Sequence, residues 1–112
     1  MSLKMDLYNE FIERIDKVSD NSKIEKIAKK VKTLNEIFDV HDTKLENFLD
    51  GVKQFFTFNP KKHIKNDLKD CFDKFETYDG DDVEKIKETL KEIVKICDED
   101  FWSRISIIFR GS

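Results

Sequence analysis

Apolar residues recur at intervals of three and four positions along almost the whole chain, and this spacing constrains the fold more than any other feature. Residues with this spacing lie on one face of an α-helix, whereas a strand facing a core would alternate apolar and polar residues. The segment from Leu45 through Phe48 and Leu49 to Val52 is one example. No segment carries a competing strand pattern, so the sequence predicts an all-α fold.

Turn-forming and capping residues divide the apolar pattern into five helices. The first is expected over residues 3–18, the second over 22–38, the third over 43–57 and the fourth from 60 to about 78. The fifth is expected from residue 83 to near the end of the sequence. A serine, threonine or aspartate followed three residues later by glutamate forms a capping box, and proline suits the first helical position. The predicted helix starts are Ser22 with Glu25, Thr43 with Glu46, Asn59 before Pro60, and Asp81 with Glu84.

Two glycines lie near the expected helix ends. Gly51 falls inside the third apolar pattern, where we expect it to weaken the helix by about 1 kcal/mol relative to alanine without ending it. Gly80 follows the fourth helix, where we expect it to adopt the left-handed conformation. A chain of 112 residues with short connections is expected to form one domain over residues 1–112, a compact antiparallel bundle of five helices.

The acidic residues Asp98, Glu99 and Asp100 decide whether the last helix is continuous. The apolar spacing keeps its phase across them, from Val83 to Ile108, without an intervening glycine or proline. We therefore predict one long helix. The alternative is a break near Asp98–Asp100 that gives six helices, because negative charge favours a helix N-terminus.

Charge and composition define the class of protein. The sequence holds 21 basic and 24 acidic residues, and its longest apolar runs are only a few residues long. It also lacks an N-terminal apolar run of the kind found in signal peptides, so we expect a soluble, cytoplasmic protein. Cys71 and Cys97 both fall on apolar helical faces, where we expect free thiols.

The nine residues from Phe101 to Phe109 contain six apolar side chains, and they carry the main functional prediction. One helical face accounts for only some of them. The others are either core residues of a central helix or a surface that binds another protein or a second copy. The predicted partner-binding residues are Ile96, Trp102, Arg104, Ile107 and Phe109.

Lysines on the polar side of the second and fourth helices offer an alternative function. Clustered positive charge can follow the phosphates of a nucleic acid. Arginines and interleaved aromatic residues are scarce there, however, and lysines on the wet side of a helix also serve solubility, so this partner is not favoured. The candidate nucleic-acid-binding residues are Lys23, Lys26, Lys29, Lys30, Lys32, Lys61 and Lys62.

Histidine phosphotransfer is a second alternative, because small helical bundles can carry phosphate on an exposed histidine. His41, followed by Asp42 and with Lys44 three residues on, is the better candidate, although it falls in a turn. His63 fits this role less well, and both histidines are also typical of solvated turns or surfaces.

No catalytic or cofactor-binding pattern competes with these readings. The cysteines and histidines lack the close pairing of zinc ligands, and no glycine-rich phosphate loop is present. Polar residues are not expected on the apolar faces, so no buried acid or base is predicted. We therefore expect no metal and no cofactor. The predicted function is a non-enzymatic protein–protein interaction module: an adaptor, a self-associating subunit or a small inhibitor.

Overall fold

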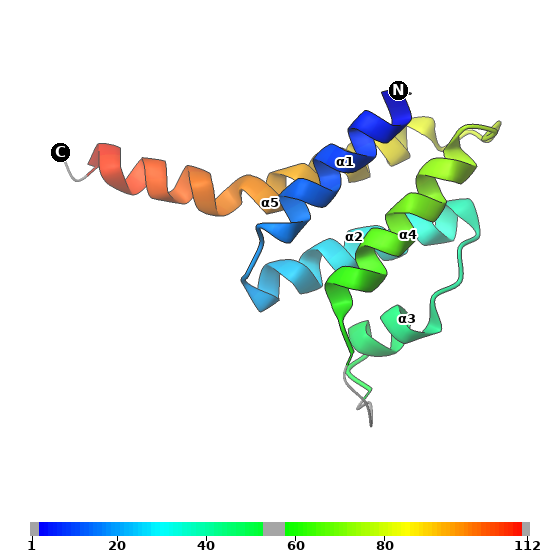
Figure 1. Cartoon of the computed structure of the whole chain (residues 1–112), viewed down its shortest axis with the longest axis horizontal. Coiled ribbons are helices and arrows are strands. Elements are labelled where there is room, and N and C mark those ends of the chain that lie inside the picture. The colour runs from blue at the N-terminus through cyan, green and yellow to red at the C-terminus, as the bar shows by residue number, and fades with distance from the viewer. Residues whose placement is uncertain (1–2, 53–57, 111–112) are drawn as a thin grey trace.

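The computed structural model describes the backbone of residues 3–52 and 58–110 and the side chains of residues 5–52 and 58–98. Within these residues the chain forms five helices and no strand, which confirms the all-α prediction. The helices pack compactly against one another (Figure 1). Their bounds are α1, Leu3–Asp16; α2, Asn21–Phe38; α3, Thr43–Leu49; α4, Pro60–Phe75; and α5, Val83–Arg110.

Helix α2 lies at the centre of the bundle. It packs against α3, α4 and α5, while α1 covers the side formed by α4 and α5. Because α2 is covered from several directions, its apolar face is almost completely buried: Ile27, Ala28 and Val31 are each 0% exposed. Ile64 and Leu68 of α4 and Ile93 of α5 complete this core, with the same 0% exposure.

In two helices the capping residue lies slightly before the predicted one. Asp20 caps α2 and accepts a hydrogen bond from the Ser22 amide, and Asp42 caps α3 and accepts one from the Leu45 amide. An aspartate carboxylate caps a helix as well as a serine or threonine hydroxyl does, so the caps predicted at the next polar residues were displaced by one or two positions. The start of α4 is as predicted, with the Asn59 side chain accepting from the Lys62 amide.

Helix α3 is shorter than predicted. It ends at Leu49, and Gly51 has a φ of 74°, in the left-handed region that favours glycine. Gly51 was predicted to lie within the helix. It instead follows the helix end. The remainder of the predicted helix, residues 53–57, lies outside the described residues.

Gly80 has a different role from the one predicted, because its φ is not positive. A Cβ atom at this position would collide with the hydroxyl and ring edge of Tyr78. That hydroxyl also accepts a hydrogen bond of 3.0 Å from the Asp82 amide. Glycine therefore leaves room for the end of the Tyr78 side chain to lie over this position. Besides Gly51 after α3, Asp39 at the end of α2 is left-handed, with a φ of 58°.

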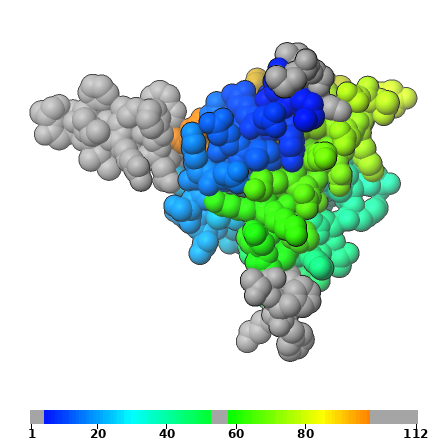
Figure 2. All heavy atoms as spheres, viewed as in Figure 1, coloured from blue at the N-terminus to red at the C-terminus, as the bar shows by residue number. Residues whose placement is uncertain are grey.

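Helix α5 is continuous through the acidic residues, as predicted. Its 28 residues from Val83 to Arg110 span roughly 42 Å at 1.5 Å per residue. Only its first part lies along the bundle, and the ribbon of its C-terminal part extends beyond the other four helices (Figure 1). In the space-filling view, the body of the bundle is formed by α1, α2, α4 and the neighbouring segments (Figure 2). Among the described residues, no helix is long and apolar enough to cross a bilayer.

Candidate functional site

The terminal extension, defined here as residues 99–110 of α5, begins just after the helix leaves α1. The Arg14 guanidinium, near the end of α1, donates a 2.8 Å hydrogen bond to the Asp98 carboxylate. From that point α5 continues for roughly another 18 Å of helix, and its backbone lies outside the bundle (Figure 1). The chain thus presents a projecting helix at one end.

The predicted partner-binding residues fall in two places. Trp102, Arg104, Ile107 and Phe109 all belong to the terminal extension, although their side chains lie outside the described residues. Ile96 is half-buried and packs against the hydrophobic core. Its contact with the core accounts for its apolar side chain, and we leave it out of the surface proposed below.

Several lysines that were candidates for nucleic-acid binding are engaged within the protein. Lys23 is 7% exposed, although it belongs to the lysine-rich run of α2. Lys30 forms an ion pair with Glu92 of α5, and Lys29 lies 4.0 Å from Glu25 one turn earlier. Intramolecular pairing of this kind reduces the positive potential that phosphates would meet.

The lysines at the start of α4 face the end of α1. Lys61 donates a 3.1 Å hydrogen bond to the Asp16 carbonyl, and the Lys65 ammonium lies 2.9 Å from the Asp16 carboxylate. The candidate lysines therefore do not form one uninterrupted basic surface. The other three, exposed or half-buried, are Lys26, Lys32 and Lys62.

The two histidines differ in their surroundings. His41 lies in the loop before α3, as expected, and its side chain is 82% exposed, 3.0 Å from the Asp39 carboxylate. His63 lies on α4 with a side chain that is 25% exposed. Its ring packs against Phe58 with a centroid separation of 4.7 Å. His63 is therefore a packed residue and not the solvated histidine expected from the sequence.

A chain of polar side chains crosses the interior and links α2, α3 and α4. The Cys71 thiol donates to the Asn35 carbonyl oxygen at 3.3 Å, and the Asn35 amide donates to the Asp67 carboxyl at 3.0 Å. Asp67 shares a hydrogen bond with Asp42, whose other partner is His63 Nδ1 at 2.8 Å. We call these five residues the polar chain. It ties the start of α3 to two other helices.

The pKa values of Asp67 and Asp42 are shifted in opposite directions. Asp67 is 5% exposed, and this burial, reinforced by Asp42 and Asp70, raises its pKa to about 7. Burial also acts to raise the pKa of Asp42. Hydrogen bonds from His63 and the Leu45 amide outweigh the effect of burial, so the pKa of Asp42 is lowered. The geometry therefore favours a neutral Asp67 that donates its proton to an ionised Asp42.

The prediction that no acid would be buried was wrong, although the sequence contained the signal. Asp67 follows Ile64 by three positions, and Asn35 precedes Phe38 by three, so both share a helical face with core residues. Each interrupts an apolar pattern that is otherwise complete. His63, Asp67 and Cys71 are also spaced four residues apart, which aligns them on one side of α4.

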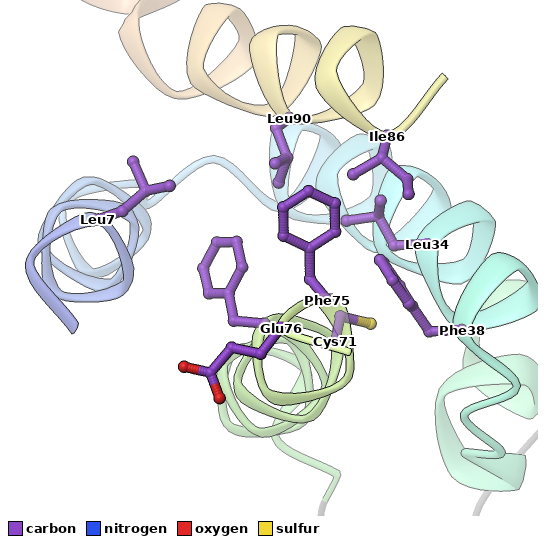
Figure 3. Close-up of a pocket in the computed structure, with 9 residues that line it drawn as sticks. Leu7, Leu34, Phe38, Cys71, Phe75, Glu76, Ile86 and Leu90 are labelled. Atoms are coloured by element: carbon purple, nitrogen blue, oxygen red, sulfur yellow. The ribbon is translucent and has the colours of Figure 1, made fainter. Parts of the chain in front are cut away.

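A second internal feature is an apolar cavity of about 240 Å³ between four helices. Cys71, the last member of the polar chain, lies at its wall. In Figure 3, Leu7, Phe75 and Leu90 point into the space between α1, α4 and α5, while the carboxylate of Glu76 points away. Its apolar lining includes Leu7, Leu34, Phe38, Phe75, Ile86 and Leu90.

These features provide little for covalent chemistry. Burial raises the pKa of the Cys71 thiol to about 12, so the thiol stays protonated and is a poor nucleophile at neutral pH. In the part of the chain that the structure describes, no three histidine, cysteine or acidic side chains are grouped so that they could hold a metal ion. Hydrogen bonding, packing and shape are what the described residues offer.

Comparison with known proteins adds no functional information. The chain matches no protein-family model, no curated protein sequence and no solved structure.

Proposed function

We propose that this protein is a non-enzymatic interaction module that uses the terminal extension of α5 to bind another protein chain. The observation that carries the proposal is the continuation of α5 past Asp98, where its backbone leaves the bundle (Figure 1). A helix in this position is accessible to a partner along its length.

The sequence of the extension supports this function. It places Trp102 and Phe109 seven residues apart, on the same side of a continuous helix, with Ile105 between them. Burial of a large apolar side chain contributes roughly 1.5–3 kcal/mol. Aromatic residues and arginine are enriched among the residues that dominate binding energy, and the extension contains Arg104 as well.

Replacement of Trp102 and Phe109 together by alanine is expected to abolish association. Alanine maintains the helix but removes two of the three aromatic side chains of the extension. Sedimentation velocity over a range of concentrations, together with affinity capture from a cell extract, measures the loss. Circular dichroism and thermal unfolding of the same samples should match the wild type.

Substitution of Ser103 and Ser106 by alanine in the same helical turns provides the matched control, which should retain full association. The proposal fails if the Trp102→Ala/Phe109→Ala protein associates normally. It fails equally if that protein merely loses stability, because the two aromatic residues would then belong to the core.

A further inference from the structure

The apolar cavity opens at the end of the molecule opposite the terminal extension. The start of α1 and the end of α4 meet there (Figure 1), and Leu7 and Phe75 line the opening. Their exposures, 43% for Leu7 and 40% for Phe75, are high for large apolar residues. Protein interiors are normally packed without such voids, so an apolar hollow with apolar residues at its opening fits a bound apolar group.

An acidic segment of the chain starts at the wall of the cavity. Glu76 lies at the wall, and the segment of residues 76–84, which connects α4 to α5, contains five acidic residues and no basic residue. The four acidic residues after Glu76 are also exposed. Negative charge disfavours fatty acids and other anionic ligands and favours an apolar group that carries positive charge. The acidic residues are Glu76, Asp79, Asp81, Asp82 and Glu84.

The terminal extension has the complementary composition. The extension begins with Glu99 and Asp100, but from residue 101 to residue 110 its only charged residues are Arg104 and Arg110, together with six apolar residues. The extension of the same molecule cannot fill the cavity, because Ile86 and Leu90 place the cavity at the opposite end of one continuous helix. A second copy of the chain can supply it.

We propose that the terminal extension of one copy docks into the apolar cavity of a second copy, with its arginines facing the acidic segment 76–84. This inference rests on the proposed function and names the partner and the receptor site. The contact joins two different surfaces, so each copy carries one donor and one receptor. Wild-type protein therefore forms open chains or closed rings.

Mixing two variants tests the proposal directly. Leu7→Lys blocks the receptor, because it adds positive charge at the exposed opening while leaving the extension intact. Trp102→Ala/Phe109→Ala disables the donor while leaving the cavity intact. Each variant alone should sediment as a monomer, with self-association weakened at least about tenfold. An equimolar mixture should form a 1:1 complex, because one donor and one receptor remain.

Two further variants keep the result interpretable. Phe75→Lys blocks the same opening from α4, so it replaces Leu7→Lys should the latter fail to fold. Val52→Lys introduces the same charge at a residue that is 52% exposed and does not line the cavity. It should associate as the wild type does.

Three outcomes would overturn the proposal. If wild-type protein associates but the mixture stays monomeric, the extension binds elsewhere, and the proposed function survives without this receptor. If Leu7→Lys and Phe75→Lys associate normally, the cavity is not the receptor. If wild-type protein is monomeric and the cavity instead binds the neutral dye N-phenylnaphthylamine, with loss of binding in Leu7→Lys, its occupant is a small apolar molecule.

Discussion

The free energy of unfolding of the wild-type protein is expected to fall as the pH rises from about 4 to above 7, and Asp67→Asn is expected to abolish this fall. The pKa of Asp67 is about 7 in the folded chain against an ordinary value of 3.8, because the carboxyl is buried. The folded state therefore retains a proton that the unfolded chain releases, and each step up in pH favours unfolding.

The size and sign of this effect follow from the two pKa values. The stabilising contribution is complete below pH 3.8 and is lost as the pH passes about 7, which corresponds to at most roughly 4 kcal/mol. Asp42 acts in the opposite direction, because its pKa is lowered and its contribution is lost only in acid. Measurements between about pH 5 and 9 therefore avoid the titration of Asp42, and the difference between the wild type and Asp67→Asn gives the contribution of Asp67.

The asparagine side chain reproduces the hydrogen bonds of a neutral Asp67. Its carbonyl oxygen can accept from Asn35, and its amide can donate to the Asp42 carboxylate. Urea denaturation followed by circular dichroism should show Asp67→Asn to be the more stable protein above about pH 8, by about 2–4 kcal/mol. Near pH 5 the two should be similar.

Asp70→Asn is the control, because Asp70 is exposed and lies three residues further along α4. It makes the same aspartate-to-asparagine change without removing a hydrogen bond of the polar chain. Asp70 is the smallest of the causes that raise the pKa of Asp67, so this variant should keep most of the pH dependence. A wild-type protein whose stability is constant across this range would contradict the interpretation. So would an Asp67→Asn protein that keeps the wild-type slope.

Asp42→Ala is expected to destabilise the protein by about 2–4 kcal/mol. The Asp42 carboxylate caps α3 through the Leu45 amide at 3.0 Å, and it also bonds to His63 and Asp67. Its removal leaves the proton of Asp67 without an acceptor in the interior, where an unmade hydrogen bond is costly. Urea denaturation at about pH 6 measures the loss.

Asp20→Ala serves as the control that separates the loss of a helix cap from the loss of the hydrogen bonds of the polar chain. Asp20 caps α2 by the same geometry, accepting from the Ser22 amide at 2.8 Å, but its surroundings are exposed. The loss in Asp42→Ala should therefore be clearly larger than the loss in Asp20→Ala. Equal losses would mean that the polar chain contributes nothing beyond the cap.

The number of helices and the core could be predicted because each depends on local spacing. The apolar positions of α2 and α4, such as Ile27, Val31, Ile64 and Leu68, follow helical periodicity and are buried. The end of α3 could not be predicted by the same means. Gly51 interrupts no apolar position, and only its positive φ places it after the helix.

The internal sites were harder to predict because they join residues that are distant in the sequence. Asn35 and Asp67 are 32 positions apart, so each appeared as an isolated polar residue on an apolar face. The position of Asp67 was informative by itself, but its partners depend on how α2 and α4 pack. The apolar cavity depends on the same packing, because four helices line it and no single segment contains it.

The two cysteines can be used as probes of local unfolding. Cys71 is 2% exposed and Cys97 is half-buried, both are free, and burial raises the pKa of both thiols. A large, charged thiol reagent does not fit the apolar cavity beside Cys71, so under native conditions it can modify this thiol only after α2 and α4 separate, and the rate of modification reports how often they do. Cys97 reports separately on α5. The rates of modification of the two thiols thus report the separation of α2 from α4 and the movement of α5, and no label has to be added to the protein.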